Sequence, residues 1–561
     1  MINLHAKPFY LQDDTIAAVE NLIDNMREEE KIGQLFVPIA YSSDPFYLKN
    51  QMLAYHIGGI MYRPGPSREM QSAHRFLQEN SKIPLLIAAN LETGGNGIAD
   101  DATFYGQQMQ IAATADPEEA YRLGKISARE GRAVGCNWAF APVVDIDMNW
   151  RNPITNVRTY GSDPDTVLSF SRKYLQALKE ENMASCLKHF PGDGADEVDQ
   201  HILTSVNTLS REDWDKSYGR LYSTLIKEGA PAIMAGHIAQ PAYQKYFNPD
   251  HPDKLMPASL SPELLQSLLR DQLGFNGLIV SDSTCMAGFS SAMEREKAVP
   301  FAIEAGCDMF LFNKDLSEDY FFMLNGYRKG LLSEERLKEA LLRILGLKAA
   351  LGLLDKNKAD LVPGPRALSA IASPAHLKAA RNCADNAVTL VKDTQHLLPL
   401  NPEKHQKVLL QVLGGFPAEA RIKKTFSALL EKEGFCVEHY VKEDFSSARF
   451  DVAHFKANYD LVIYLANVEN ASNQVTNRLS WYTFWGNGNN VPWFVEERPA
   501  LFISLANPYH LIDVPMIKTY INCYSNSDFM LEALMEKLLG RSPFKGRSPA
   551  DPFLGKEYLK Y

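Results

Sequence analysis

Residues 184–201 read ASCLKHFPGDGADEVDQH, and this stretch decides the fold prediction for the chain. Its first four residues form a short apolar run typical of a buried strand, and Pro191, Gly192 and Gly194 prevent a helix from continuing it. The charged groups therefore follow the carboxyl end of a strand, where parallel α/β folds bind ligands. A solvated loop with paired histidines is the alternative, but two imidazoles, an ammonium and several carboxylates are more than that requires.

The composition limits the number of domains and the kinds of partner that can be expected. The 561 residues exceed the roughly 250–300 residues of a single core, so two or three domains are expected. A hydrophobic fraction of 45% and a charged fraction of 22% are those of a globular protein. A net charge of -10 without clusters of Lys and Arg argues against nucleic acid and favours a small polar partner.

The termini and cysteines suggest a compartment. We find no secretory signal segment and no apolar run long enough to span a bilayer, so we expect a cytoplasmic protein with no membrane partner. The seven cysteines are scattered and never spaced C-x-x-C, which favours reduced thiols over disulfides or a zinc site.

Apolar runs alternate with amphipathic segments through the first two thirds of the chain. The runs are 35–39, 59–61, 85–88, 138–144, 184–187, 232–234, 278–280 and 309–312. The sequence Ser261-Pro262-Glu263 favours a helix start, and a final helix is predicted over 333–351. Eight strand–helix units predict an α/β fold with a (β/α)8 TIM-type barrel.

A second domain follows the barrel. The stretch 356–374 is rich in Pro and Gly and lacks periodicity, so we place a linker there between a catalytic domain at 1–355 and a smaller open α/β sandwich domain at 375–561. Its predicted strands are 408–412, 436–440, 461–465, 500–505 and 519–523, with helices near 418–432 and 528–539. The aromatic segment 481–486 suits sugar stacking or an interface, and we expect this domain to lie near the barrel mouth or support a dimer. Monomer and homodimer both stay open.

Polar residues follow consecutive predicted strands of the barrel. They are Asn90 after the third, Asp145 and Arg158 after the fourth, Lys188 and His189 after the fifth, His237 after the sixth and Asp282 after the seventh. Because the carboxyl ends of barrel strands meet at one face, these residues predict one concave site.

Two positions suit particular chemistry. Asp282 directly follows the run 278–280, and a carboxylate on a rigid strand end suits a nucleophile, with helix capping as the alternative. Asp199 and His201 stand two residues apart, and the carboxylate can fix the imidazole tautomer and favour its protonated form. His201 is therefore a candidate proton donor and acceptor.

Five motifs carry a family resemblance. The residues KHFPG at 188–192, Asp199-x-His201, Ala235-Gly236-His237, PASLSP at 257–262 and GFNGLIVSD at 274–282 resemble glycoside hydrolase family 3, most closely its β-N-acetylglucosaminidase branch. The likeness covers roughly residues 10–355 and extends weakly into 387–400.

The resemblance implies a retaining, exo-acting β-N-acetylhexosaminidase that removes N-acetylglucosamine. Asp282 would be the nucleophile, and His201 assisted by Asp199 would be the acid/base. Arg158, Lys188 and His189 match sugar-binding positions, and we expect Asn90 and His237 to contact substrate as well. No metal or cofactor is expected.

One motif departs from the family pattern. Where Asp-x-Glu-Gly-Gly is usual, the chain reads Asn90-Leu91-Glu92-Thr93-Gly94-Gly95, and an arginine that follows in the branch is absent. An amide binds a hydroxyl less strongly than a carboxylate does. A β-glucosidase and an N-acetylglucosaminide phosphorylase of the same family therefore remain alternatives. Phosphate would meet less repulsion beside a neutral imidazole than beside a carboxylate.

Two alternatives come from other classes of protein. His189, His201, His237 and Asp282 also form a ligand set for a metal-dependent hydrolase, although Lys188 beside His189 would repel a cation. A sugar-binding protein that has lost catalysis is suggested by Asn90, but Asp282, Asp199 and His201 are all present.

Overall fold

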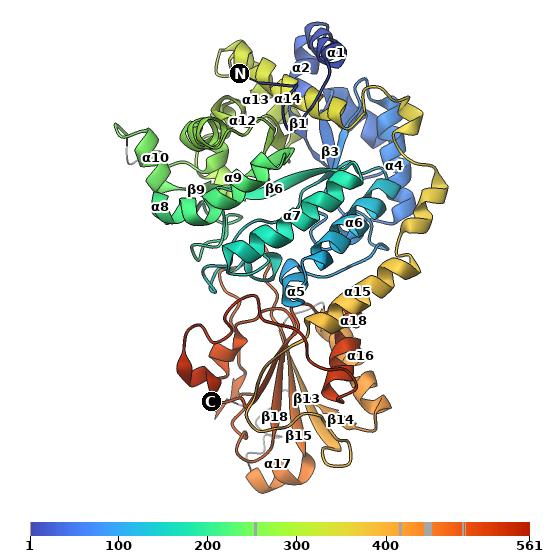
Figure 1. Cartoon of the computed structure of the whole chain (residues 1–561), viewed down its shortest axis with the longest axis vertical. Helices are drawn as coiled ribbons and strands as arrows, with labels where there is room; N and C mark the ends of the chain where they lie inside the picture. Colours follow the sequence, from blue (N-terminus) through green and yellow to red (C-terminus); the bar gives the residue numbers. More distant parts are fainter. Residues whose placement is uncertain (1, 252–254, 415–417, 442–450, 485–486, 489) are drawn as a thin grey trace. The chain divides into compact units, whose positions relative to one another are not determined.

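The computed structural model describes residues 2–251, 255–414, 418–441, 451–484, 487–488 and 490–561. The chain divides into two compact units. The first contains Met1–Phe104, Ala120–Asn152 and Val167–Leu377, and the second contains Tyr105–Glu119, Pro153–Thr166 and Lys378–Tyr561. Each unit is built around its own largely parallel sheet (Figure 1).

The predicted barrel strands form a closed parallel ring in the described part of the first unit. In ring order they are β1 (Phe36–Val37) with β2 (Ile39–Ala40), β3 (Gly59–Tyr62), β4 (Leu86–Ala89), β5 (Trp138–Ala139), β6 (Ala184–Phe190), β8 (Ala232–Ala235), β10 (Leu278–Ser281) and β11 (Phe310–Leu311). β2 pairs with β3 and β1 pairs with β11, while a bridge between Val280 and Met309 joins β10 to β11. The (β/α)8 prediction is confirmed.

The barrel strands are buried along their length, which explains why they read as continuous apolar runs. Helices of this region include α1 (Asp13–Asp24), α2 (Glu28–Gly33), α4 (Ser67–Asn80), α6 (Glu118–Ala133), α7 (Pro164–Glu180), α9 (Arg220–Lys227), α12 (Arg295–Ala305), α13 (Leu316–Arg328) and α14 (Glu334–Ala350). The predicted final helix is α14, and the Ser333 side chain caps it by accepting from the Arg336 amide. The helix after Ser261 and Pro262 is η7 (Glu263–Gln272), which has π-helical hydrogen bonding.

The strand predicted at 138–144 is shorter in the structure. β5 ends at Ala139, although the Phe140 amide still donates to the Ala89 carbonyl at 2.8 Å. Pro142 has no amide hydrogen and interrupts the ladder. Pairing resumes further on, where the Val144 amide donates to the Lys188 carbonyl at 2.8 Å.

The second unit contains a mixed sheet with strand order β12-β19-β18-β15-β13-β14. The predicted strands are confirmed as β13 (Lys407–Gly414), β14 (Cys436–His439), β15 (Leu461–Asn467), β18 (Ala500–Ser504) and β19 (Thr519–Asn522), and the predicted helices as α16 (Ala418–Lys432) and α18 (Asp528–Leu538). A strand that the periodicity did not predict, β12 (Thr389–Asp393), adds antiparallel to β19. Helices α15 (Pro374–Ala387) and α17 (Val452–Asn458) complete the main elements.

Two segments from within the range 1–355 pack with this second unit. The amide nitrogen of Asn470 donates to the Ile154 carbonyl at 3.1 Å, and the Ser525 hydroxyl donates to the Gln110 side chain at 2.6 Å. The first compact unit, in turn, continues to Leu377. The linker at 356–374 stays a prediction. No described helix combines the length and the apolar character needed to cross a bilayer.

Candidate active site

The predicted site residues of the first unit gather at the carboxyl end of the barrel. Asn90 follows β4, Asp145 lies beyond β5, Lys188 and His189 end β6, His237 follows β8, and Asp282 follows β10. The β6 strand carries two of them because the barrel ladder continues to Phe190. Parallel strands therefore deliver residues that are far apart in sequence to one edge of the sheet.

Asp282 is held rigidly at the barrel rim. Its amide donates to the Ala235 carbonyl at 2.8 Å, and its Oδ1 accepts from the Ser283 amide at 2.6 Å. Burial alone would raise the pKa of this carboxyl. The neighbouring His189, His237 and His201 and the Ser283 amide outweigh burial, so the pKa of Asp282 lies below its ordinary value. An ionised carboxylate with a 13% exposed side chain is the form that a nucleophile requires.

His189 lies between two carboxylates. Its Nδ1 is 2.7 Å from Asp145 Oδ2, and its Nε2 is 3.9 Å from Asp282 Oδ2. Asp145 Oδ1 also accepts from the amides of His189 at 3.0 Å and Asp193 at 2.8 Å. These contacts fix the imidazole ring with one edge toward Asp282.

Lys188 connects the ends of β6 and β4. Its side chain is nearly fully buried, and its Nζ lies 2.6 Å from Glu92 Oε1. The same ammonium donates to Asn90 Oδ1 at 3.2 Å. A buried charge of this kind is tolerated because it is paired and hydrogen-bonded. Asn90 and Lys188, both predicted as substrate-binding residues, therefore lie in direct contact.

Asp199 and His201 form the predicted pair. The His201 Nδ1 lies 2.7 Å from Asp199 Oδ1, and the His201 amide donates to the same oxygen at 2.9 Å. The Asp199 side chain is fully buried, whereas that of His201 is 27% exposed. Because a carboxylate accepts, Nδ1 carries the proton donated to Asp199, and Nε2 is the second ring nitrogen.

The loop that carries His201 is joined to the loop that follows Asp282. The Ala287 amide donates to the His201 carbonyl at 2.9 Å, and the Gly288 amide donates to the Gln200 carbonyl at 3.3 Å. A Cβ at Gly288 would lie 2.5 Å from that Gln200 oxygen, so only glycine allows this approach.

His237 has protein partners at both ring nitrogens. Its Nε2 is 2.9 Å from the Ser283 carbonyl, which can only accept, so Nε2 carries the proton and Nδ1 accepts from the Ser259 hydroxyl at 2.8 Å. Burial lowers the pKa of His237, which agrees with a neutral ring. These contacts hold the residue next to Asp282, and a sugar contact by His237 stays a prediction.

Arg158 and the aromatic segment 481–486 belong to the second unit. Arg158 ends the short 3₁₀ helix η4 (Asn156–Arg158), and its role in sugar binding stays a prediction. Trp481 is half-buried and packs edge-on against Tyr464 with ring centroids 6.4 Å apart, which is a structural contact. Trp485 and Gly486 lie outside the described residues.

Sequence reasoning missed three partners. Asp145 was noted at a strand end but not paired with His189, and Glu92 was quoted in its motif without a role. Gln200 donates to Asp193 at 3.2 Å and accepts from the His237 amide at 2.7 Å, which ties the His201 loop to β8. The only sequence signal for Asp145 and Glu92 was their place after predicted strands, and for Gln200 it was its place between Asp199 and His201.

The arrangement does not favour a metal centre. No set of three or more His, Cys, Asp or Glu side chains in the described residues is grouped to hold a metal ion. Of the four ligands considered, His237 has both nitrogens engaged by serine residues, and the Nδ1 of His189 is held by Asp145. The ligand set predicted from sequence therefore does not converge on one point.

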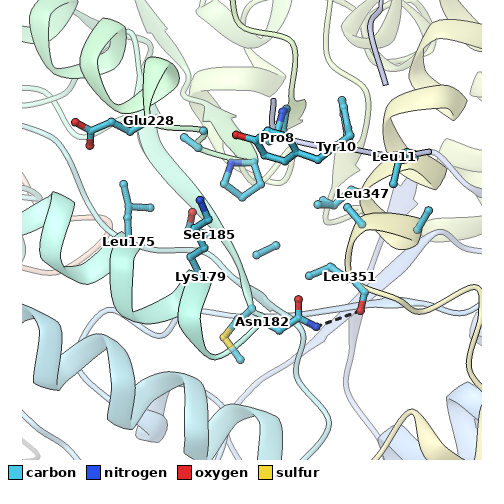
Figure 2. A pocket seen from close by; sticks show the side chains of 18 of the residues that line it. Pro8, Tyr10, Leu11, Leu175, Lys179, Asn182, Ser185, Glu228, Leu347 and Leu351 are labelled. Atoms are coloured by element: carbon cyan, nitrogen blue, oxygen red, sulfur yellow. Dashed lines mark hydrogen bonds between the residues drawn. The ribbon is translucent and has the colours of Figure 1, made fainter. Parts of the chain in front are cut away.

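A large cavity lies elsewhere in the first unit. Its volume is about 660 Å³. It is lined by the start of β6 at Ser185, the end of α7 at Lys179, Leu347 near the end of α14 and Leu351 just after it (Figure 2). These residues mark the amino end of the barrel. None of the predicted site residues lines it.

A parallel barrel whose strand ends carry a carboxylate, imidazoles and a lysine defines the class as an enzyme of the (β/α)8 type. Residues 28–347 match the N-terminal domain of glycosyl hydrolase family 3. A β-N-acetylglucosaminidase/β-glucosidase of Cellulomonas fimi is 44% identical over 567 residues, which cover 99% of each chain. This chain belongs to glycosyl hydrolase family 3 and is an enzyme of that family.

Solved structures agree with this assignment. The structure of the β-glucoside phosphorylase BglX is similar with a TM-score of 0.93 at 42% identity, over 99% of each chain. The glycoside hydrolase family 3 β-N-acetylglucosaminidase from Paenibacillus sp. str. FPU-7 has a TM-score of 0.78 at 23% identity, covering 94% of this chain and 99% of that one. The second likeness shows the two-domain fold.

Proposed function

We propose that this protein is a retaining, exo-acting β-N-acetylhexosaminidase that removes β-linked N-acetylglucosamine. The observation that carries the proposal is the Asp199–His201 contact of 2.7 Å on a loop hydrogen-bonded to the one that follows Asp282. It joins a candidate proton donor to an ionised candidate nucleophile.

Each residue has one role in the proposed reaction. Asp282 attacks the anomeric carbon while the Nε2–H of His201 protonates the departing glycosidic oxygen, which leaves a covalent glycosyl-enzyme. The neutral His201 then takes a proton from water as the water attacks that carbon, and the carboxylate of Asp282 leaves. Asp199 holds the His201 tautomer and stabilises its positive charge.

The substrate class is supported by the names of the relatives and by Asn90. The Cellulomonas fimi relative is named for both N-acetylglucosaminides and glucosides. Since Asn90 Oδ1 accepts from Lys188, its amide N–H groups are directed elsewhere and would donate to a sugar hydroxyl. An aspartate at this position could only accept. The sugar is therefore held by a different set of donors and acceptors from those of the usual family motif.

Aryl β-N-acetylglucosaminide and aryl β-glucoside, compared by kcat/KM, test the sugar. We expect the first to react faster, and a faster glucoside would overturn the choice of sugar. Proton NMR of the first-formed product tests the stereochemistry. A β-anomer is expected from a double displacement, and an α-anomer formed first would contradict the covalent intermediate.

Phosphorolysis is a second candidate function. It is favoured by the similarity to a β-glucoside phosphorylase over the whole chain and by the imidazole at the acid/base position. After it has given up its proton, His201 is neutral, so an anionic acceptor meets less repulsion than beside a carboxylate. Phosphate would then attack the glycosyl-enzyme in place of water.

Product analysis with and without millimolar phosphate distinguishes the two reactions. Phosphorolysis gives the sugar 1-phosphate, detected by ³¹P NMR, and an increased rate. Free sugar alone, at an unchanged rate, would leave hydrolysis as the only activity. Sulfate at the same ionic strength is the control for a general salt effect.

A further inference from the structure

A row of three side chains crosses the end of the barrel, carboxylate–imidazole–carboxylate. Asp145 Oδ2 is 2.7 Å from His189 Nδ1, and His189 Nε2 is 3.9 Å from Asp282 Oδ2. The Asp145 side chain is 1% exposed and the His189 side chain 7%. Water therefore screens neither interaction strongly.

Asp145, the outer carboxylate of the row, is held in place by backbone amides. Asp145 Oδ1 accepts from the amides of His189 and Asp193, and its Oδ2 faces the imidazole. A carboxylate that accepts three hydrogen bonds is stabilised as the anion. Because an ionised carboxylate has no proton to give, Nδ1 of His189 must carry one.

Asp282, the inner carboxylate of the row, determines whether His189 Nε2 carries a proton. With Nδ1 protonated, a neutral ring would place the lone pair of Nε2 3.9 Å from the anionic Asp282 Oδ2, which is repulsive. Only the doubly protonated ring offers an N–H to each of its two carboxylate neighbours. We propose that Asp145 is a positioning residue that keeps His189 as an imidazolium, so that the ring holds Asp282 in its ionised, nucleophilic form.

This inference rests on the proposed function and adds a step to it. When the bond between Asp282 and the sugar breaks, the electron pair returns to the Asp282 oxygen, and the imidazolium stabilises the carboxylate that forms. The pKa of Asp282 lies below its ordinary value despite burial, with His189 as the leading charge among its neighbours. This agrees with the geometry.

Other titratable groups surround the row and must be considered in any pH profile. On the Asp282 side they are His237, His201, Cys186 and Lys188, and on the Asp145 side they are Asp193, Asp147, Tyr218 and Tyr222. Asp193 is the useful control, since it is buried near Asp145 but hydrogen-bonds Asn152 and Gln200 rather than the imidazole. Burial, followed by the Asp145 charge, raises the pKa of Asp193.

The first test is the acid limb of kcat/KM. In Asp145→Asn the amide donates to Nδ1, so the ring becomes neutral with its proton on Nε2. The positive charge of His189 beside Asp282 is then lost, which raises the pKa of the Asp282 carboxyl. The acid limb of kcat/KM should therefore move up by about one pH unit or more, because an opposite charge at this distance lowers a carboxyl pKa by that much. Asp193→Asn should leave the limb where it is. An unmoved limb in folded Asp145→Asn would overturn the proposal.

A double-mutant cycle shows whether Asp145 acts through His189. In a His189→Gln background, Asp145→Asn should shift the limb no further, since no imidazolium remains to be lost. An equal shift in both backgrounds would mean that Asp145 acts on Asp282 by another route, which contradicts the proposal.

The last measurement does not depend on activity. In protein labelled with ¹⁵N-histidine, the two nitrogens of His189, assigned by their loss in His189→Gln, should both have imidazolium shifts at pH 7. In Asp145→Asn one should move to the value of an unprotonated nitrogen. A neutral ring in the wild type would overturn the proposal, even if Asp145→Asn did not fold. Retained turnover in Asp282→Asn would instead refute the proposed function, whereas the His189 shifts of the wild type test its protonation separately.

Discussion

The carbonyl oxygen of His201 accepts a hydrogen bond from the amide of Ala287 at 2.9 Å. This contact joins the loop after β6, which carries Asp199 and His201, to the loop after β10, which begins with Asp282. The two groups that the proposed reaction places on opposite sides of one glycosidic bond are therefore held by a shared backbone contact rather than by two independent loops. Their relative position depends on how closely these loops approach.

Gly288→Ala tests that approach. The added Cβ would lie 2.5 Å from the Gln200 carbonyl oxygen and 3.0 Å from that of Leu203, so the loops must separate. A displacement near 1 Å can reduce turnover about 100-fold, and we expect a loss of that order in kcat/KM. Gly364→Ala is the matched control, because no atom lies within 4 Å of its added Cβ. Equal activity in both variants would contradict a tight contact.

Asp282→Asn should abolish turnover while preserving the fold. The amide has nearly the shape of the carboxylate and can still accept from the Ser283 amide, but it is not a nucleophile. A loss of at least about 10⁴-fold on an activated aryl glycoside is expected, with the thermal midpoint close to that of the wild type. A variant that keeps a tenth of the activity would show that another residue is the nucleophile.

His201→Gln should affect substrates according to their leaving group. Proton donation is worth about 10²–10⁴-fold when the leaving oxygen is basic, and little when it is a dinitrophenolate. We therefore expect a large loss of kcat on an alkyl or disaccharide substrate and a small loss in formation of the glycosyl-enzyme from the dinitrophenyl glycoside. Equal losses on both substrates would argue that His201 only positions the loop.

Buried His74 makes stability depend on pH. Its Nδ1 lies 2.6 Å from the Val134 carbonyl, and burial lowers its pKa to about 4. The unfolded residue takes up a proton below its ordinary pKa of about 6.5, whereas the folded residue does so only near 4, so its contribution is complete above 6.5 and is lost as the pH falls. It amounts to about 2 kcal/mol between pH 7 and 5.

Chemical denaturation at pH 7 and pH 5 measures this contribution. In His74→Gln the difference between the two pH values should be smaller by about that amount. His5→Gln is the control, because the His5 side chain is 60% exposed. A pH dependence that His74→Gln leaves unchanged would contradict the assignment.

A chain ending at Leu377 tests the second unit. Removing residues 378–561 removes Ser525 and Asn470, which hydrogen-bond Gln110 and Ile154. It also exposes the two segments that carry Gln110 and Ile154. We expect a poorly soluble product with a lowered thermal midpoint. A soluble and fully active product would show that catalysis does not need residues 378–561 of the second unit.

The strands could be predicted where burial alone determines the pattern. Barrel strands such as β8 and β10 are buried on both faces, so their sequence is apolar whatever they pair with. β12 was not predicted because its burial alternates irregularly and it includes Lys392 and Asp393. It becomes a strand by pairing with β19, which lies more than a hundred residues further along the chain.

In the candidate site, too, local contacts could be predicted from sequence and contacts between distant residues could not. Asp282, Asp199 and His201 were proposed from residue type and place alone, and the short spacing of the last two already brings them into contact. Asp145 and His189 stand 44 residues apart, and no local pattern pairs them. No local pattern pairs His237 with Ser259 and Ser283 either, which contact its two ring nitrogens.

The sequence by itself determined most of the elements that form and which chemical groups stand at their ends, since apolar periodicity, turn residues and capping act over a few neighbouring residues. Tertiary structure alone decided which of those groups meet. Closing the barrel brought Asp145, His189 and Asp282 into one row and set Lys188 against Asn90 and Glu92. Protonation and hydrogen bonding depend on distances of a few ångströms between residues remote in the chain, and only the folded barrel fixes those distances.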